Sequence, residues 1–326
     1  MKNQKIPSYF LIAVSNRENL DLCLNHMMAG FPNSINGAWV FCDVEVGDFV
    51  SFLYAAHAYG LYRIRKKVAI LNAERAPPWK PLKFRSGRMY YFPFRLLLEP
   101  VRDFKESLIR AEFAYVAENL LLRGGYAKTH FQADQTTLQS ASQLGRPVGQ
   151  VPPRSPSLDE YETFTPKFTS DKKRVNMSDT FPFREVILQT LIRKYLSLSD
   201  NLSRFLQYMD VMDISPQELE ILGEKALPEG HVDILIKERI PIGKAKVVIV
   251  EVKVHRAALK DIEQLRQYKD EIGTECVGAC LIAEKFSRKV ILLKRDIKIL
   301  KYKLDISKHK TYTFNELLEM LSLEEL

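Results

Sequence analysis

Cysteine is scarce in this chain, and its spacing fits neither a disulfide framework nor a zinc site. The sequence holds four cysteines, Cys23, Cys42, Cys276 and Cys280. The last two lie close together, but no nearby Cys or His pair completes the four ligands of a structural zinc. Their apolar neighbours favour buried, reduced thiols in a cytoplasmic protein.

Three other features are missing. No apolar run reaches the roughly 18 residues that a membrane-spanning helix needs, so we expect no membrane partner. The chain begins Met-Lys-Asn-Gln-Lys and passes directly into a strand-like run, without the apolar core and cleavage site of a secretory signal. No Gly-x-x-x-x-Gly-Lys-Ser/Thr motif is present, so this chain supplies no ATP-driven translocation.

What is present describes a globular protein with a basic surplus. Of the 326 residues, 46% are hydrophobic and 27% are charged, which excludes a wholly disordered chain. That length is sufficient for two domains. The net charge of +8 suits a polyanionic partner such as DNA.

The composition changes in the middle of the chain. Apolar periodicity is lost between residues 145 and 182, where six prolines are mixed with Ser, Thr and charged residues. Such a stretch is typical of an interdomain linker. We therefore predict an N-terminal domain over residues 1–144, a linker over 145–180 and a C-terminal domain over 181–326.

The N-terminal part reads as mostly β. Alternating or densely apolar runs bounded by turn residues predict short strands, and Pro93 inside the last of them indicates an edge or a bulge. A helix that ends at Gly124-Gly125 follows. A small β-barrel with helices accounts for this pattern. The expected strands cover 9–14, 48–54, 60–65 and 90–98, and the expected helix covers 103–122.

The C-terminal part has an α/β pattern. Helical and strand-like segments alternate, and the short run Pro241-Ile-Gly-Lys fits the turn of a hairpin. We expect helices over 183–195, 256–272 and 314–323, and strands over 230–236, 246–254, 277–283 and 297–304.

Two of the C-terminal strands carry charges where a buried strand should be apolar. The run Val247-Val-Ile-Val-Glu-Val-Lys-Val254 is dense enough to be a central strand, and Glu251 and Lys253 lie on one face of it. Asp233 interrupts the apolar strand expected beside it. Buried carboxylates cost several kcal/mol unless they are paired or metal-bound. Oxygen ligands of this kind suit Mg²⁺ or Mn²⁺.

The order of these residues resembles the signature of the PD-(D/E)xK nucleases. Gly230-His-Val-Asp233 is followed, after seventeen residues, by Glu251-Val-Lys253. The proline of the family's name is replaced by Val232. The resemblance extends over roughly residues 181–290 and implies an α/β nuclease core in the C-terminal domain.

Two helices strengthen the resemblance. The first carries Glu185 in Arg184-Glu-Val-Ile-Leu-Gln189, where many family members place a further acidic residue of the metal site. The second carries Gln264-Leu-Arg-Gln-Tyr268, which looks like the Gln-x-x-x-Tyr motif of the RecB-like and NucS-like branches. The resemblance implies that Gln264 and Tyr268 orient the site or the nearby phosphodiester.

The resemblance also assigns roles to the charged residues. It implies that Asp233, Glu251 and the main-chain carbonyl of Val252 bind Mg²⁺ or Mn²⁺. Glu185 would bind a second metal or order water on the first. Lys253 would position or activate the attacking water and offset charge on the phosphate.

The N-terminal part resembles the PUA-like superfamily, closest to the EVE and YTH modules, which hold a flipped, modified base in an aromatic pocket. The resemblance implies a base-binding role for Trp39 and Trp79, both in loop-like contexts, and more weakly for Tyr54 and Tyr59. Plugging of the barrel by either tryptophan is an equal alternative. The resemblance depends on Tyr9-Phe-Leu-Ile, Gly37-Ala-Trp39, Val46–Tyr54, Gly60–Ile64, the segment around Trp79 and Tyr91–Pro100.

Basic residues cluster in the same part of the chain. Between residues 61 and 100 there are ten lysines and arginines but only two acidic residues, Glu74 and Glu99. Such a cluster suits phosphate binding, although a solvated basic face is the alternative. The candidate phosphate ligands are Arg63, Arg65, Lys66, Lys67, Arg85 and Arg88.

Together these features predict a modification-dependent DNA endonuclease. The N-terminal domain would flip and read a methylated or hydroxymethylated base in duplex DNA, and the C-terminal domain would hydrolyse a nearby phosphodiester bond. Cutting both strands needs two sites, so we expect a homodimer. Two alternatives stay open: a NucS-like nuclease that acts on branched or mismatched DNA, and a non-catalytic binder of modified nucleic acid.

Overall fold

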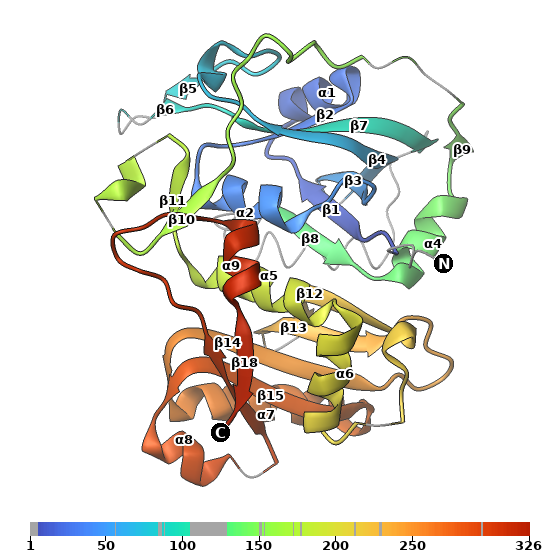
Figure 1. The fold of residues 1–326 in the computed structure, drawn as a ribbon. Helices are drawn as coiled ribbons and strands as arrows, with labels where there is room; N and C mark the ends of the chain where they lie inside the picture. The colour runs from blue at the N-terminus through green and yellow to red at the C-terminus, as the bar shows by residue number, and fades with distance from the viewer. Residues whose placement is uncertain are drawn as a thin grey trace. The chain divides into compact units, whose positions relative to one another are not determined.

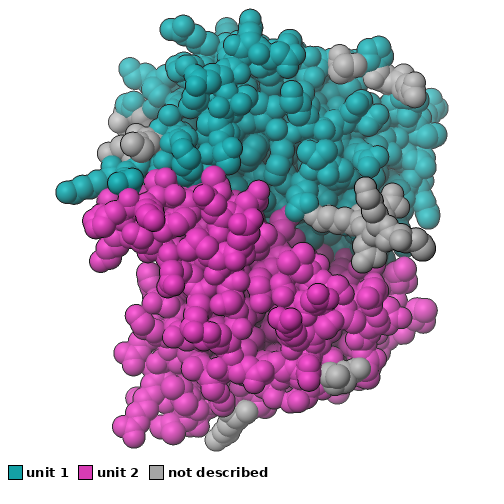
Figure 2. Space-filling view, in the orientation of Figure 1, with its two compact units in different colours: residues 1–167, 172–181 teal, residues 168–171, 182–326 magenta. Residues whose placement is uncertain are grey.

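The chain forms two compact units, shown in Figure 2. Unit 1 comprises residues 1–167 and 172–181, and unit 2 comprises residues 168–171 and 182–326. The computed structural model describes residues 6–55, 57–83, 87, 89–104, 129–149, 152, 154–171, 173–176, 178–211, 213–227, 230–294 and 296–326.

Unit 1 is built on one mixed sheet, whose strands run in the order β2-β7-β4-β3-β1-β8, with β9 beside β7 (Figure 1). The β1 and β3 strands are parallel, and the other pairs are antiparallel. In the described part of the chain β2 and β8 do not pair, so the sheet is an open half-barrel. The strands are β1 (Tyr9–Ala13), β2 (Met28–Phe31), β3 (Phe49–Tyr54), β4 (His57–Ala69), β7 (Phe94–Asp103), β8 (His130–Ala133) and β9 (Arg146–Pro147).

Two of the expected strands differ from the structure for local reasons. The segment expected over 60–65 is the middle of the thirteen-residue β4. The segment expected over 90–98 is interrupted: Met89–Tyr90 forms β6, which pairs with β5 (Leu82–Lys83), and β7 starts only after Pro93. Proline has no N–H to give to a strand ladder, which explains the break.

Unit 1 also contains helices that the sequence did not reveal. In α1 (Arg17–His26) the Asn16 side chain accepts the N–H of Asn19, and in α2 (Ile35–Asp43) Ser34 accepts that of Gly37. A third helix, α4, covers Gln135–Gln143. The helix expected over 103–122 lies outside the described residues from residue 105 onward, and Asp103 ends β7.

The stretch expected to be a linker contains ordered elements. Residues 146–147 form β9, and β10 covers Lys167–Thr169. A short 3₁₀ turn at Arg174–Asn176 precedes β11 (Thr180–Pro182). Pro147 and Pro182 lie within these short strands, at positions where prolines are tolerated.

Unit 2 is built on a six-stranded sheet in the order β12-β13-β14-β15-β16-β18. The first three strands form an antiparallel meander, whereas β14, β15 and β16 are parallel, and β18 closes the edge antiparallel to β16. The strands are β12 (Leu219–Leu227), β13 (Gly230–Glu238), β14 (Val247–Ala257), β15 (Cys276–Phe286), β16 (Lys298–Lys303) and β18 (Ser322–Glu325).

The helices of unit 2 cover this sheet. The α5 helix contacts β12, β13 and β14, and the α7 helix contacts β14 and β15. Ile262 and Leu265 of α7 are fully buried in one cluster with Ile249 and Leu281 of the sheet. The α7 helix starts at residue 259, later than expected, because β14 continues to Ala257. The helices are α5 (Glu185–Leu196), α6 (Ser199–Tyr208), α7 (Leu259–Ile272), α8 (Arg288–Leu293) and α9 (Phe314–Met320).

Candidate active site and candidate base pocket

Two neighbouring strands of unit 2 bring the first candidate residues together. β13 pairs antiparallel with β14, and Ile234 lies opposite Val250. This register places the Asp233 carboxylate against β14, where Oδ2 accepts the main-chain N–H of Val252 at 2.7 Å. Asp233 is therefore fixed to the residue between Glu251 and Lys253.

Lys253 joins the carboxylates of two elements. Its Nζ lies 2.7 Å from Oε1 of Glu251 on its own strand and 3.6 Å from Oε1 of Glu185 at the start of α5. Asp233, Glu251, Lys253 and Glu185, which lie far apart in the sequence, therefore gather at one place in unit 2.

The main chain after Lys253 is held from two sides. The N–H of Val254 donates to Oε2 of Glu185 at 3.3 Å, and its carbonyl accepts the hydroxyl of Tyr302 at 2.5 Å. The register between β14 and β15 shifts between Lys253 and Arg256, so the strand is irregular at this point. Tyr302 comes from β16, and nothing in the sequence distinguished it from an ordinary core tyrosine.

Gln264 and Tyr268 form a hydrogen-bonded pair on α7. The Nε2 of Gln264 donates to the Tyr268 hydroxyl at 2.6 Å, and that hydroxyl also accepts the main-chain N–H of His231 at 3.2 Å. Tyr268 is buried. The pair therefore fixes β13 two residues before Asp233.

Burial and like charge set the electrostatics of the site. Burial, with a contribution from the nearby Glu251 carboxylate, raises the pKa of Asp233 well above its usual range. Burial also raises the pKa of Glu251, which the Lys253 ammonium only partly offsets. For Lys253 burial lowers the pKa, but Glu251 and Asp233 outweigh it and the net shift is upward. Lys253 is therefore a cation. Its single positive charge does not compensate for the negative charge of the surrounding carboxyl groups.

One carboxylate oxygen at this place has no compensating partner. Glu251 is 2% exposed, and its Oε2 is buried without a hydrogen-bond partner. A buried carboxylate oxygen without a partner costs free energy, which a hard divalent cation relieves. Over the described ranges, no group of three or more His, Cys, Asp or Glu side chains is arranged to hold a metal ion. Asp233, Glu251 and Glu185 nevertheless bring carboxylate oxygens to this place, which is the ligand type that Mg²⁺ and Mn²⁺ prefer.

In unit 1 a cavity of about 270 Å³ lies against Trp79. Trp79 is 6% exposed, and its ring packs against that of Phe92 with the centroids 5.8 Å apart. Aromatic and small residues from several elements complete the wall. The lining residues include Phe31, Tyr90, Phe92, Ser15, Asn19 and Thr129. Sequence reasoning found Trp79 but not these partners, because they lie on segments far apart in the chain.

The other aromatic candidates do not line this cavity. Trp39 lies within α2 and not in a loop, and it is 4% exposed with its ring edge-on to His130 at 4.5 Å. Tyr54 and Tyr59 belong to β3 and β4 and are half-buried. The structure thus brings Trp79 to a cavity and keeps the other three on different elements.

The candidate phosphate ligands have different environments. Arg63, Arg65 and Lys66 are exposed on β4. Arg65 approaches Glu99 at 3.9 Å, and Lys66 approaches Asp159 at 3.7 Å. These exposed ion pairs are weak and leave the side chains accessible to a polyanion.

Lys67 differs from its neighbours. Its Nζ donates to the carbonyls of Phe41 and Val44 at 2.7 and 2.8 Å, and burial lowers its pKa. Lys67 therefore satisfies carbonyls at the end of α2, and this ammonium is directed inward and not toward solvent. Arg85 and Arg88 lie outside the described residues.

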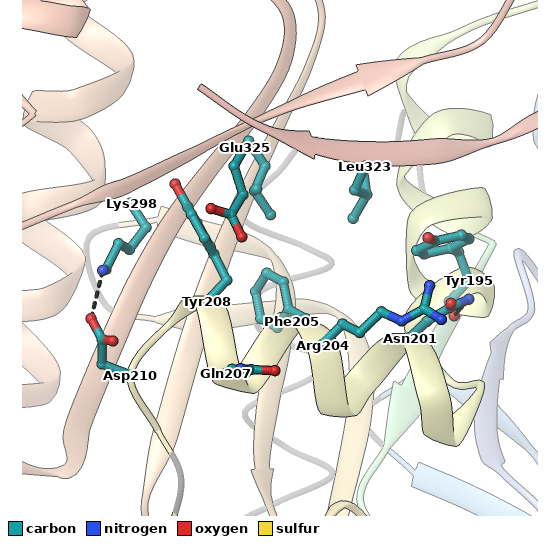
Figure 3. A pocket seen from close by; sticks show the side chains of 11 residues that line it. Tyr195, Asn201, Arg204, Phe205, Gln207, Tyr208, Asp210, Lys298, Leu323 and Glu325 are labelled. Carbon is teal, nitrogen blue, oxygen red and sulfur yellow. Dashed lines mark hydrogen bonds and ion pairs between the residues drawn. The ribbon is translucent and has the colours of Figure 1, made fainter.

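A second hollow, of about 590 Å³, opens in unit 2 beside α6. Figure 3 shows Tyr208 and Phe205 of α6 beside Glu325 of β18, while Arg204 extends toward Asn201 and Tyr195. Lys298 is hydrogen-bonded to Asp210 at 2.6 Å. None of the candidate nuclease residues lines it. Its lining side chains are of mixed charge, unlike the mostly apolar lining of a typical small-ligand pocket.

Comparisons with known proteins give distant matches only. No protein-family model matches the sequence, and a search of curated proteins finds no relative. Among solved structures, the chain is similar to a repair endonuclease from Pyrococcus abyssi (18% identity, 33% of this chain and 46% of that chain, TM-score 0.23). It is also similar to EndoMS in the EndoMS-dsDNA2 complex (23% identity, 33% of this chain and 44% of that chain, TM-score 0.22).

A third match is the DNA modification-dependent restriction endonuclease AspBHI, at 12% identity over 84% of this chain and 63% of that chain, with a TM-score of 0.20. The chain spans less than half the length of the first two structures. No helix of the described residues is long and apolar enough to cross a membrane.

Proposed function

We propose that this protein is a Mg²⁺- or Mn²⁺-dependent DNA endonuclease of the PD-(D/E)xK type, with its active site at the β13–β14 pair. One observation carries the proposal. Asp233, Glu251 and Lys253 converge on adjacent strands, with a buried carboxylate oxygen of Glu251 left without a partner. A structural ion pair alone does not explain two carboxylates and one lysine at a buried position.

The residues divide the chemical work of phosphodiester hydrolysis. When bound, the divalent cation supplies Lewis acidity that stabilises negative charge on the scissile phosphate. Lys253, held as a cation between Glu251 and Glu185, donates a hydrogen bond to the attacking water or to the phosphate. Gln264 and Tyr268 hold the start of β13, and with it Asp233, in place.

The aromatic cavity of unit 1 is proposed to read a modified base. Trp79, Tyr90 and Phe92 offer stacking surfaces, and a base flipped from a duplex needs such surfaces. Thr129, Ser15 and Asn19 add polar groups that hydrogen-bond to base edges. The substrate is therefore duplex DNA with a methylated or hydroxymethylated base, and Arg63, Arg65 and Lys66 contribute phosphate contacts.

A cleavage assay tests both halves of the proposal. Four matched duplexes would carry unmodified DNA, N6-methyladenine, 5-methylcytosine or 5-hydroxymethylcytosine, each incubated with Mg²⁺ or Mn²⁺. Lys253→Ala should lose cleavage, whereas Lys289→Ala, which removes an exposed lysine of α8, should retain it. Preferred cutting of one modified duplex names the base. Equal cutting of all four would retain the nuclease and reject the modified-base reader.

Two strands of a duplex need two catalytic events, so we propose that a homodimer makes a double-strand break. Light scattering of the protein on its substrate provides the test. A monomer that still cuts both strands would contradict the dimer. Cleavage of unmodified branched or mismatched DNA would instead favour the NucS-like repair function, and tight binding of modified nucleic acid without metal-dependent cleavage would favour a non-catalytic binder.

A further inference from the structure

Arg95 is a buried cation in the middle of β7. Its exposed fraction is zero, although arginine is among the side chains that proteins rarely bury. Its Nη2 donates one long hydrogen bond, of 3.3 Å, to the carbonyl of Ala76. Its Nε and Nη1 are buried without any hydrogen-bond partner. Most of the hydrogen-bonding capacity of this guanidinium is therefore unused.

No carboxylate among the described residues neutralises this charge. Within the described part of the chain, Arg95 has no ion-pair partner, and the groups that act on it electrostatically are the Cys23 thiol and the Tyr161 hydroxyl. Burial lowers the pKa of Arg95 to about 9, which leaves the side chain cationic at neutral pH. A buried, unpaired cation is costly and requires a functional explanation.

The charge lies directly behind the aromatic cavity. The Arg95 guanidinium covers one face of the Trp79 ring, with Cζ 4.4 Å from the ring centroid. Gly30 permits this stacking, because a Cβ there would approach both Nη1 of Arg95 and the Trp79 ring to 2.8 Å. Gly30 and Trp79 line the cavity, whereas Arg95 does not. Any base that stacks on Trp79 must therefore use the face opposite Arg95.

A second polar group indicates that this cavity takes a ligand. The Oγ1 of Thr129, which lines the cavity, is buried without a hydrogen-bond partner. Asn19 and Ser15 also line the cavity, and the Asn19 amide donates to the Ser15 hydroxyl at 3.1 Å. An apolar cavity with a few convergent polar groups is the usual form of a small-ligand site.

We propose that Arg95, acting through Trp79, makes this cavity select an electrically neutral modified base and reject methylated bases that carry a positive charge. The inference rests on the base-reading role proposed above and adds the charge class of the base. Arg95 is a specificity-determining residue that does not touch the base. N6-Methyladenine and 5-methylcytosine belong to the accepted class, and N1-methyladenine and N3-methylcytosine to the rejected class.

The expected size of the effect follows from distance. A base stacked on the face of Trp79 opposite Arg95 would lie about 8 Å from the guanidinium, since Cζ is 4.4 Å from the ring centroid and stacked rings are separated by about 3.5 Å. Two positive charges at that distance in a protein environment repel by about 2 kcal/mol, which corresponds to roughly 30-fold weaker binding. Salt screens this repulsion little, because the cation is buried.

Isomeric bases provide the sharpest test. Duplexes would carry either N6- or N1-methyladenine, and either 5-methyl- or N3-methylcytosine, each opposite an abasic site so that base pairing does not affect the cost of flipping. Affinity of the full-length protein for each duplex would be measured by fluorescence anisotropy in EDTA. We expect the neutral isomer of at least one pair to bind about 30-fold tighter than its cationic isomer.

Variants of Arg95 then locate the origin of the discrimination. Arg95→Met removes the charge but keeps a long side chain, and should bring the two isomers to within about threefold. Arg95→Lys should keep the discrimination, as should Arg102→Met on the same strand. Melting by circular dichroism checks that the variants fold, and Arg95→Gln replaces Arg95→Met if the latter does not.

Each contrary outcome has a distinct meaning. Equal or tighter binding of both cationic isomers by the unmutated protein would overturn the charge selection while leaving base reading intact. Full discrimination in the neutral Arg95 variants would also overturn it, because the charge would then not be its origin. If no modified duplex bound better than an unmodified one, base reading itself would fail, and the charge selection with it.

Discussion

The candidate active site and the aromatic cavity treat buried charge in opposite ways. At β13–β14 two carboxyl groups and a lysine lie within hydrogen-bonding range of one another or of the main chain, and the unsatisfied atom is a carboxyl oxygen of Glu251. Behind the cavity of unit 1 the unsatisfied nitrogens belong to a cation, Arg95, whose guanidinium lies over one face of the Trp79 ring. A buried anion suits a metal ion, whereas a buried cation behind an aromatic ring can only act at a distance.

The largest expected effect is on the rate of cleavage, when the negative charge of Glu251 is removed. Glu251→Gln keeps the size of the side chain but removes a negative charge and the ion pair with Lys253. We expect the rate of cleavage to fall by at least about 10²–10³-fold, because stabilisation of charge in the transition state is lost. Single-turnover cleavage in saturating Mg²⁺ measures it. A variant within tenfold of the unmutated protein would remove Glu251 from the site.

The next effect concerns the aromatic side. Trp79→Ala should weaken binding of the preferred modified duplex by about 1–3 kcal/mol, or roughly 5- to 150-fold, since a stacking surface is removed. Affinity for unmodified duplex should change little. Trp39→Phe is the matched control: Trp39 is buried in α2, so this change should lower the melting temperature without altering the preference for the modified duplex. If Trp39→Phe removed the preference for the modified duplex and Trp79→Ala did not, Trp39 would be the residue that stacks on the base.

A smaller effect tests the positioning of Lys253. Tyr302→Phe removes the hydroxyl that donates to the carbonyl of Val254. We expect kcat to fall by about tenfold with KM within about twofold, because a displaced lysine affects the transition state more than substrate binding. Tyr208→Phe is the control, since it removes a hydroxyl bonded at 2.8 Å to the carbonyl of Ile299, also on β16. Equal losses in both variants would indicate a general loss of packing.

The smallest effect is on stability. Because the pKa of Asp233 is raised in the fold, the protonated form is favoured there, and ionisation at neutral pH costs stability. Asp233→Asn should therefore raise the melting temperature in EDTA by about 2–4 °C at neutral pH, corresponding to about 1 kcal/mol. The gain should begin to shrink once the pH falls below the raised pKa, and should vanish only below the ordinary pKa of aspartate, where the carboxyl is protonated in the unfolded chain as well.

Asp179→Asn gives the opposite sign and serves as its control. Burial there opposes ionisation, but the hydrogen bonds from Lys167 at 3.0 Å and from the Thr180 hydroxyl at 2.9 Å, together with the Lys167 charge, outweigh it and hold the pKa of Asp179 below its usual range. The variant should therefore be less stable at neutral pH. Destabilisation by both substitutions would show that the Asp233 carboxylate is stabilising and that its pKa is not raised.

The sequence predicted the central strands of unit 2 better than it predicted the elements of unit 1. The run Val247–Val254 is apolar on both faces, so a central strand and the burial of Glu251 followed directly from its pattern. Helices α1 and α2 were missed because their apolar stripes are short and they follow closely on strands. Trp39 was expected in a loop-like context, yet it lies inside α2.

For both candidate sites, local sequence patterns identified some residues, and tertiary packing was needed to identify the others. Local spacing pointed to Glu251 and Lys253, but Tyr302 reaches the main chain of Val254 from β16, a relation set by the order of the strands. Tyr90 and Phe92 became visible as partners of Trp79 only through the tertiary packing of unit 1. Lys67 looked like its exposed neighbours in sequence, and only the position of α2 shows that it binds carbonyls.

The central claim is that the β13–β14 site hydrolyses DNA with the aid of a divalent cation. Cleavage of the four matched duplexes by the unmutated protein, first in Mg²⁺, then in EDTA, and then after Mn²⁺ is restored, tests it most directly. We predict cutting in Mg²⁺, none in EDTA and recovery in Mn²⁺. Undiminished cutting in EDTA, or no cutting of any duplex with either metal, would contradict it.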